Sequence, residues 1–503
     1  MPIPYNQQDA GQTWTTQTSR KHYISDDYSI GEVITIIESG AVLRQATYEL
    51  LYDYYKGNHR GIQQRFFDDL NKPNNKIVNN FPKLIVDTTT SYLVGEEVSY
   101  RGNQKAIDAI MPILQANNVN DVNFEEVKLG GIMGHAMEIH WLDGESQHRF
   151  KQVPASQCFI AYSMDIEEIP LVGVHYNTYR GADNVTRRNV TVYTENEVIK
   201  FVYEVPTQGH EGSISYNEKS RTEHFWGELP VIEVVANDER IGDFEAQISQ
   251  VEAYNMAQSD SLNDVNYMND SYLWLKGFTA TEPEDIQAMK NNRVMITEAD
   301  PEGDTDIKWL TKEVNDTHIE NIKKRLKEDI FSFSQTPDLS GDNFSASSGV
   351  AIKYRTQTLE NKAKVKETKL NAAMKKRFRL IGKTLALKGK VVDYDDVYPV
   401  FVRNLPASLS ELADMIVKLK GTVSDETLIA QLGFIPDPVE EVERATKQLE
   451  KQMVAQAGGV SIAKENKLDN NQTGNTSSTL SAVALKAQET ARNKEPLNQP
   501  KAK

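Results

Sequence analysis

The sequence predicts an α+β protein that is mainly helical, and three observations support this fold class. At 503 residues, the chain is long enough for about three domains. Apolar side chains recur at helical spacing in several long segments, whereas residues 138–235 contain short runs of strand-forming residues separated by Gly, Asp and Asn. Residues 1–30 and 454–503 are polar and poor in aliphatic side chains, so we expect a flexible N-terminal arm and a disordered C-terminal tail.

Composition excludes several classes of protein. The 56 Lys and Arg against 72 Asp and Glu give a formal charge of −16, which disfavours a protein that wraps nucleic acid. The same charge is compatible with DNA that passes through a pore without adhering to its wall. A single cysteine, Cys158, excludes an internal disulfide and a Cys-based zinc site. The sequence has no run of about 18 apolar residues, so we expect no membrane partner.

Residues 31–242 form the first, mixed region. A helical pattern from Ile30 to Tyr54 ends at Gly57, a typical C-terminal helix cap. A second helix is predicted over residues 81–94, with Leu84, Thr88, Ser91 and Val94 on one face. Short segments with strand patterns follow at Glu138–Trp141, Phe150–Val153, Cys158–Tyr162, Leu171–Tyr179, Val190–Tyr193, Val198–Val205 and 229–235.

Two long helices then flank a small α/β unit. The first is predicted over residues 243–268, and the second begins at the capping box Thr317-x-x-Glu320. The apolar stripe expected on the second helix comprises Ile319, Ile322, Leu326 and Ile330. The unit between them, residues 271–311, contains a short helix at 281–291 and strands at Tyr272–Lys276, Arg293–Thr297 and Ile307–Leu310.

The rest of the chain is helical. Pro337 ends the second long helix, and residues 337–349 are rich in turn formers and predict a loop. A helix from about residue 348 to 387 would be roughly 60 Å long. Because this exceeds one globular core, we expect it to act as a strut between domains or subunits, with a buried stripe of Leu370, Met374, Phe378, Ile381 and Leu385. Shorter helices follow after Ser408, Ser424 and Asp437.

Sequence patterns for catalysis are weak, and we expect no catalytic residue, cofactor or metal. The segment Gly382-Lys383-Thr384 lacks the first glycine of a phosphate-binding loop, because that position is Arg377. One pattern formally resembles a nuclease: Asp338 followed by Glu360-x-Lys362. Glu360 and Lys362 lie two residues apart in a predicted helix, so their side chains should point in different directions.

Positive charge is segregated into two helical segments. Residues 362–390 hold eleven Lys or Arg against the single acid Glu367. A second basic group comprises Lys323, Lys324, Arg325 and Lys327. These side chains either pair with acidic neighbours in the same chain, or contact a neighbouring copy or DNA phosphate.

The order of elements and five short motifs resemble the portal (head–tail connector) proteins of tailed double-stranded DNA bacteriophages, of the long-tailed siphovirus type. The motifs are residues 54–59 (YYKGNH), 79–95 (NNFPKLIVD continuing to SYLVG), 340–353 (SGD and SGVAIK), 421–427 (GTVSDET) and 437–444 (DPVEEVER). They occur in the expected order along residues 35–453. A single motif of this length would be weak, but all five in order are specific.

The resemblance implies a portal fold with wing, stem, clip and crown. Residues 31–242 would form the wing, 243–270 and 312–336 the stem helices, and 271–311 the clip. Residues 337–349 would form the tunnel loop, 350–404 the very long spine helix and the end of the wing, and 405–453 the crown. Twelve copies would form a ring around a DNA channel at one capsid vertex, or thirteen in isolated rings. Assembly would take place in the host cytoplasm.

The resemblance also implies sites and partners. The tunnel loop would present Asp338, Leu339, Ser340, Gly341, Asp342, Asn343, Phe344 and Ser345 to the channel. The basic group Lys323, Lys324, Arg325 and Lys327 would face the channel or a neighbouring subunit. The clip would contact the terminase large subunit during packaging and the head-completion adaptor afterwards, through Glu282, Glu284, Asp285, Lys290 and Arg293. Scaffolding and major capsid proteins would be further partners.

Two other functions stay open from the sequence alone. One is a metal-dependent DNA-processing nuclease built on Asp338, Glu360 and Lys362. The other is an oligomeric adaptor that has no channel. The portal hypothesis predicts that shortening residues 337–349 blocks DNA packaging or causes leakage, whereas the adaptor hypothesis predicts no effect.

Overall fold

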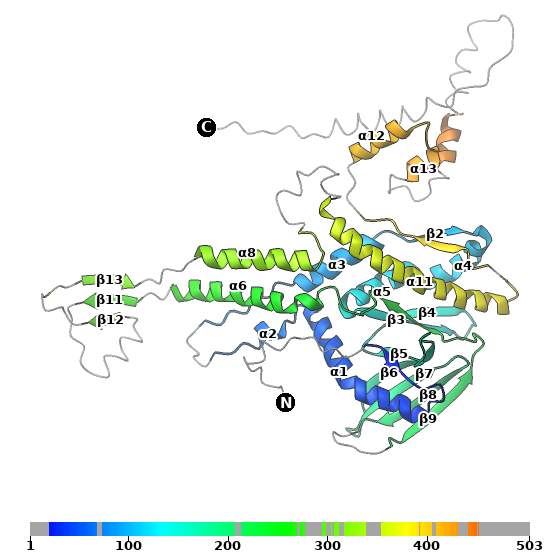
Figure 1. The fold of residues 1–503 in the computed structure, drawn as a ribbon, viewed down its shortest axis with the longest axis horizontal. Helices are drawn as coiled ribbons and strands as arrows, with labels where there is room; N and C mark the ends of the chain where they lie inside the picture. Colours follow the sequence, from blue (N-terminus) through cyan, green and yellow to red (C-terminus); the bar gives the residue numbers. More distant parts are fainter. Residues whose placement is uncertain are drawn as a thin grey trace, which may run out of the picture. The chain divides into compact units, whose positions relative to one another are not determined.

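The computed structural model mixes helices and strands, as the sequence predicts (Figure 1). It describes residues 20–67, 73–206, 213–268, 272–276, 294–297, 303, 306–310, 316–338, 354–391, 393–404, 409–430, 441–449 and 451. The chain divides into two compact units. Unit 1 comprises Met1–Gly341 and Arg355–Asn404, and unit 2 comprises Asp342–Tyr354 and Leu405–Lys503. No helix in the described part of the chain is both long and apolar enough to cross a bilayer.

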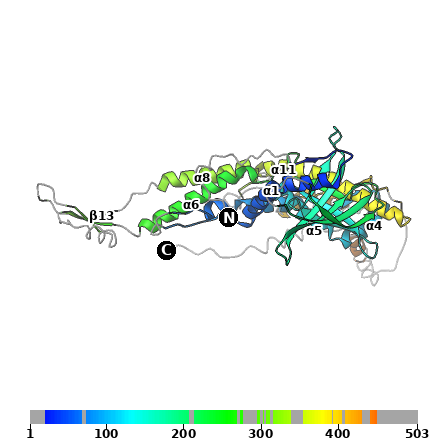
Figure 2. The same ribbon diagram turned by 90° about the horizontal axis from the view of Figure 1, so that it is seen from below.

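A six-stranded sheet forms one layer of unit 1. Its strand order is β1-β5-β6-β7-β8-β9, antiparallel except for the parallel β1–β5 pair. The strands are β1 (His22–Tyr23), β5 (Cys158–Tyr162), β6 (Pro170–Arg180), β7 (Thr186–Tyr193), β8 (Glu197–Glu204) and β9 (Tyr216–Glu223). Helix α1 (Ile30–Lys56) lies against this sheet (Figure 2). It buries Val33, Ile34 and Ile37 there and ends at Gly57 as predicted.

Two features of this layer differ from the sequence prediction. Residues 20–30 belong to the fold and are not part of a flexible arm, because β1 pairs with β5 and Ile24 is buried in the sheet core. The sequence analysis also missed β9. All eight of its residues are exposed, so the strand has no alternation of apolar and polar side chains.

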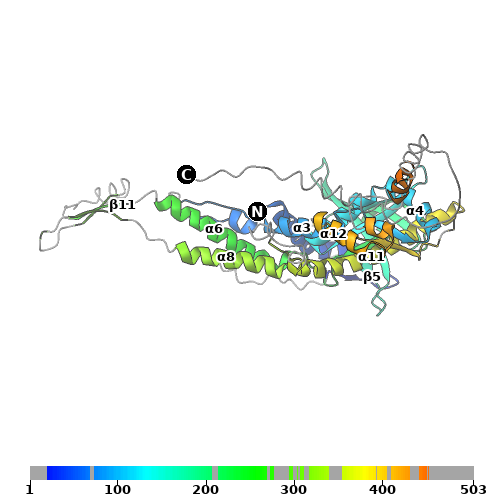
Figure 3. The same ribbon diagram turned by 90° about the horizontal axis from the view of Figure 1, so that it is seen from above.

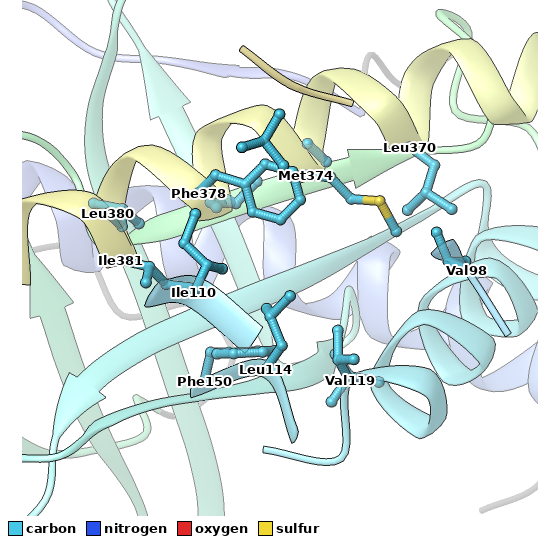
Figure 4. Close-up of a cluster of buried hydrophobic side chains, with 14 of the residues drawn as sticks. Val98, Ile110, Leu114, Val119, Phe150, Leu370, Met374, Phe378, Leu380 and Ile381 are labelled. Carbon is cyan, nitrogen blue, oxygen red and sulfur yellow. The ribbon is translucent and has the colours of Figure 1, made fainter. Parts of the chain in front are cut away.

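A second layer surrounds a three-stranded antiparallel sheet with the order β10-β3-β4. Its strands are β3 (His135–Leu142), β4 (His148–Pro154) and β10 (Val231–Val235). Four helices pack around it: α3 (Phe81–Val94), α4 (Gln104–Ala116), α5 (Val119–Met133) and α11 (Gln357–Leu387). Figure 4 shows the side chains that α11 directs toward Ile110 and Leu114 of α4 and Phe150 of β4. The sequence analysis did not identify α4 or α5.

Helix α11 corrects the expectation of a strut. It has 31 residues, about 46 Å, and begins at Gln357 after a turn at Thr356. Residues 354–355 before this turn are also helical, and the predicted start at residues 348–353 lies outside the described residues. The predicted stripe is confirmed, since Leu370, Met374, Phe378, Ile381 and Leu385 are all buried. Burial extends from Leu359 to Leu385 within unit 1, so the helix belongs to the core of its own chain. After it, β14 (Val397–Val400) pairs with β2 (Ser99–Gly102).

The predicted pair of long helices is present as α6 (Ile248–Met268) and α8 (Asp316–Phe333), which lie side by side (Figure 3). A short 3₁₀ turn, Glu245–Gln247, precedes α6. Between them in the sequence are β11 (Tyr272–Lys276), β12 (Val294–Thr297) and β13 (Asp306–Leu310), which form a sheet with the order β12-β11-β13. The short helix predicted at residues 281–291 lies outside the described residues.

Two buried faces differ from those predicted. On α8, Ile322 is 42% exposed and Lys323 is buried in its place, so the inner stripe is Ile319, Lys323, Leu326 and Ile330. On α3, Leu84 is exposed, and the side chains buried instead include Ile85, Val86, Thr89 and Leu93. On α8 a single position of the predicted stripe is wrong, whereas on α3 the buried face lies about one residue from the predicted set, of which Val94 is buried.

Unit 2 is helical in its described part. It contains α12 (Leu409–Leu419), α13 (Asp425–Ala430) and a helical segment at residues 441–449. Gly421 adopts a positive φ of 85° after α12, and the Ser424 hydroxyl accepts from the backbone N–H of Thr427 at the start of α13. These are the helix boundaries that the sequence predicts.

Candidate functional site: where α6 and α8 join unit 1

The structure describes five of the residues predicted to function at a channel. They are Asp338, Lys323, Lys324, Arg325 and Lys327. The rest of the predicted tunnel loop, Leu339 to Ser345, lies outside the described residues. So do the predicted clip contacts Glu282, Glu284, Asp285, Lys290 and Arg293.

The basic group on α8 separates into paired and exposed members. Lys323 is buried and pairs with Glu320 one turn earlier. Lys327 pairs with Asp338 at 2.7 Å, which joins α8 to the start of the predicted tunnel loop. Lys324 and Arg325 are exposed. These two are therefore the members of the group best placed to contact another molecule.

An apolar cluster holds the ends of α6 and α8 where they join the rest of unit 1; we call this region the root. Phe81, the first residue of α3, meets the ring of Tyr254 on α6 at 5.1 Å and that of Phe331 on α8 at 5.8 Å, both edge to face. The rest of the root comprises Tyr48, Leu51, Tyr54, Ile85, Val86, Ile132, Met133, Ala155, Phe244, Ile248, Val251 and Ile330. The motif at residues 79–95 therefore contributes the aromatic side chain that touches both helices.

Residues 73–79 lie along α6 and bind it through matched polar contacts. The backbone N–H groups of residues 75, 77 and 79 donate to Asn263 (2.8 Å), Ser259 (2.9 Å) and Asn255 (2.8 Å). Two residues of extended chain span about 6.6 Å and four residues of helix about 6.0 Å, so the two periods nearly coincide. Arg65 adds an ion pair to Asp260 at 2.6 Å. The polar face of α6 is thus used inside its own chain.

The nuclease hypothesis is not supported, because its three residues have different partners. Glu360 accepts from Arg403 at 2.8 and 3.0 Å and from Tyr92 at 2.7 Å. The Arg403 hydrogen bond lowers the pKa of Glu360. Lys362 donates to the carbonyl of Ser334, and Asp338 pairs with Lys327. The described residues contain no group of three or more His, Cys, Asp and Glu suited to a metal ion.

Most of the positive charge on α11 is paired with acids of the same chain. The pairs are Lys362 and Lys366 with Asp243, Lys364 with Glu367, Lys369 with Asp238, Arg377 with Glu126 and Glu138, and Arg379 and Lys383 with Glu228. Of the two alternatives left open by the sequence, pairing within the chain holds for these seven side chains.

Arg377 is the member of this series that sequence reasoning missed. Its guanidinium, 1% exposed, donates to Asn123 at 2.7 Å, to Glu126 at 2.9 Å and to Glu138 at 2.9 and 3.0 Å. Burial acts to raise the pKa of Glu138, but Arg377 and His140 hold it well below its usual range. Burial and the charge of Glu138 raise the pKa of Glu126. The sequence does contain a signal that Arg377 is buried, because it lies on the apolar stripe of the helix, three residues after Met374.

Comparison with known proteins gives one consistent result. A family model described as phage portal protein, SPP1 Gp6-like, matches residues 40–455. The portal protein of Bacillus phage SPP1 is 23% identical over 400 residues, which cover 77% of this chain and 78% of the relative. The portal protein of Clostridium phage phiCD119 is 24% identical over 434 residues, which cover 82% of this chain and 94% of the relative.

Two solved structures have lower similarity. A chain from the neck of an empty GTA particle is 12% identical with a TM-score of 0.41, covering 71% of this chain and 89% of that one. A chain from the virion of a native gene transfer agent (GTA) particle is 13% identical with a TM-score of 0.40, covering 79% of this chain and 99% of that one.

Proposed function

Because this chain belongs to the SPP1 Gp6-like family of phage portal proteins, we propose that its copies form a closed ring around a DNA channel at one capsid vertex. The family match over residues 40–455 carries this proposal. The chain is therefore a phage portal protein and a structural protein of the virion, not an enzyme. Twelve copies would form the ring in the virion, and isolated rings would contain twelve or thirteen.

The parts of the ring are assigned from the order of elements. Residues 31–242 and 350–404 form the wing with its spine helix, 243–270 and 312–336 the stem, and 271–311 the clip. Residues 337–349 form the tunnel loop and 405–453 the crown. The side-by-side packing of α6 and α8, with a separate three-stranded sheet between them in the sequence, supports the stem and clip assignments.

The ring conducts double-stranded DNA into the procapsid during packaging and out of the virion on ejection. Asp342 in the tunnel loop repels phosphate, whereas the charge of Asp338 is balanced by Lys327, so DNA slides without being held. Lys324 and Arg325, exposed on α8, contact DNA or the neighbouring subunit. The clip docks the terminase large subunit and later the head-completion adaptor of a long-tailed particle. Scaffolding and major capsid proteins surround the ring, which assembles in the host cytoplasm.

The test is native mass spectrometry combined with electron-microscope class averages of the purified full-length chain, without DNA or nucleotide. The expected result is a ring of twelve or thirteen copies with a central hole. Rings that lack a hole would support the channel-less adaptor. A chain that stays monomeric even when co-expressed with its scaffolding and major capsid proteins would contradict the proposal.

A further inference from the structure

At the end of α8, one of the last backbone carbonyls accepts a hydrogen bond from another helix. Gln335 follows the helix in a left-handed conformation with φ of 56°, which is uncommon for a residue other than glycine. The N–H groups of Gln335 and Thr336 return to the carbonyls of Ser332 and Phe331, as in a Schellman motif. The Ser334 carbonyl, one of the last of the helix, accepts from the nearby Thr336 hydroxyl at 3.3 Å and also from a side chain of another helix.

That donor is Lys362 on α11. Its Nζ donates to the Ser334 carbonyl at 3.0 Å and lies 3.5 Å from Oδ1 of Asp243. The lysine side chain is only 12% exposed. A cation at the C-terminus of a helix is favoured by the helix dipole. Lys362 therefore caps α8 from outside the helix, 28 residues later in the sequence.

Asp243 connects the same lysine to the start of α6. Its backbone N–H donates to the Gly131 carbonyl at the end of α5 at 2.7 Å, which fixes the residue to the wing region. Its carboxylate, 3% exposed, also binds Lys366 at 2.7 Å. The 3₁₀ turn that leads into α6 begins two residues later. The end of α8, the start of α6 and α11 thus meet at one buried ionic contact.

As a source of folding stability alone, this buried ionic contact is unfavourable, because its charged groups lose their contact with water on folding. Two buried lysines share a single aspartate, and burial lowers the pKa of Lys362 to about 8. Buried ion pairs replaced by well-packed apolar side chains are often equally or more stable. An apolar residue at 362 would fill the space, but it could not bind a carbonyl and a carboxylate at two separate helix ends.

We propose that Lys362 is a positioning residue that sets where α8 ends, and so where the predicted tunnel loop leaves the stem. The inference rests on the portal function proposed above. The hydrogen bond between Lys362 and Ser334 joins two residues that lie on either side of the predicted tunnel loop in the sequence. The Lys327–Asp338 pair holds the first residues of that loop to α8. A shift of α11 or of Asp243 relative to α8 is transmitted to the loop through the lysine.

The test compares three variants of the full-length chain assembled into rings. Lys362→Met keeps the length and removes the donor, and Lys362→Arg restores a cationic donor. Lys364→Met is the matched control, because Lys364 is 64% exposed on the same helix and pairs only locally with Glu367. The first readout is amide hydrogen exchange of residues 330–338, and the second is the fraction of DNA-filled particles.

We expect exchange at residues 330–338 to be at least 10-fold faster in Lys362→Met and close to wild type in the other two variants. DNA-filled particles should fall at least 10-fold for Lys362→Met while rings still assemble. The proposal is wrong if exchange changes by less than 2-fold, if it rises equally in β6 and β7, or if Lys362→Met fills particles as Lys364→Met does. Should Lys362→Met not fold, Asp243→Asn tests the same link by removing its counter-charge, and unchanged exchange would reject the proposal.

The two proposals fail in different ways. If wild-type chains form no ring or yield no DNA-filled particles, the portal function itself is contradicted. If wild-type chains fill particles and Lys362→Met fills them equally well, only the positioning role is lost.

Discussion

Arg377 allows the sharpest test of what holds unit 1 together. Arg377→Met would leave Glu126 and Glu138, both buried, without their shared guanidinium. Removing one partner of a buried ion pair typically costs about 3–5 kcal/mol of unfolding free energy. The side chain also lies 5.0 Å over the Phe150 ring, a contact that methionine partly retains. The expected loss at pH 7 is therefore about 3–5 kcal/mol.

The loss should depend on pH with a defined sign. In wild type, Arg377 holds the pKa of Glu138 below its usual range, so Glu138 is ionised in the folded chain from pH 5 to 7. In Arg377→Met the buried Glu138 must carry a proton, while in the unfolded chain it stays ionised above about pH 4.5. The folded variant then binds more protons than the unfolded variant, so its stability falls as pH rises. At about 1.4 kcal/mol per unit, the defect should be up to about 3 kcal/mol smaller at pH 5 than at pH 7.

Urea unfolding followed by circular dichroism, at one protein concentration and at pH 5 and 7, measures both quantities. Arg377→Met with Glu138→Gln should recover most of the loss, because glutamine is neutral and no buried carboxylate has to take up a proton on folding. Arg379→Met is the matched control and should cost less than about 1 kcal/mol, since Arg379 is 44% exposed in its pair with Glu228. A loss below 1 kcal/mol for Arg377→Met, or an equal loss at both pH values, would refute the reasoning.

Three further predictions concern substitutions at single positions. Burial lowers the pKa of His148 to about 2, so below pH 6.5 only the unfolded chain takes up its proton. His148 should therefore contribute about 2 kcal/mol to the loss of stability from pH 7 to pH 5 in an unfolding titration. His148→Gln removes this contribution, whereas the other histidines whose pKa burial lowers, His59, His135, His175 and His224, keep theirs. Gly134 has φ of 84°, and an added Cβ would lie 1.8 Å from the Arg240 carbonyl oxygen. Gly134→Ala should therefore lower the melting temperature by several degrees. Gly144→Ala is the control and should not lower it, because the space around Gly144 is open. Phe81→Ala should cost about 3–5 kcal/mol in urea unfolding and speed hydrogen exchange in α6 and α8 together, and faster exchange in only one helix would contradict its bridging role.

The elements that could be predicted from sequence are those with their own local pattern. The stripe on α11, the end of α1 at Gly57 and the strand Cys158–Tyr162 all follow from side-chain spacing or a cap within a few residues. β9 has no such pattern, because every one of its residues is exposed and its place is set by pairing with β8. Residues 73–79, the segment that runs along α6 and that we call the strap, also have no local pattern, since their partners lie 176 to 188 residues away.

The candidate site was predictable in outline but not in its contacts. The sequence identified the basic group on α8, and could not show that Lys323 is buried while Lys324 and Arg325 are exposed. That distinction depends on which face of α8 meets α6. The sequence analysis placed Ile322 on this face because it is apolar, whereas the structure places Lys323 there. Lys362 stood out for a nuclease pattern, whereas its actual partners, Ser334 and Asp243, come from two other elements.

The contacts at the root differ between the two long helices, and the difference bears on which can move. Helix α6 is held along three successive turns by the strap, at Asn255, Ser259 and Asn263, in addition to its apolar base. In the part of the chain that the structure describes, the contacts of α8 with the rest of unit 1 beyond α6 cluster at its end, through Ile330, Phe331 and the Ser334 carbonyl. Apart from its packing along α6, α8 is anchored at one end, so it can tilt about that end more readily than α6, which is anchored along three turns. If the proposed stem changes shape while DNA passes, α8 should therefore move about its C-terminal end while α6 stays with the rest of unit 1, and Lys362 lies at that pivot.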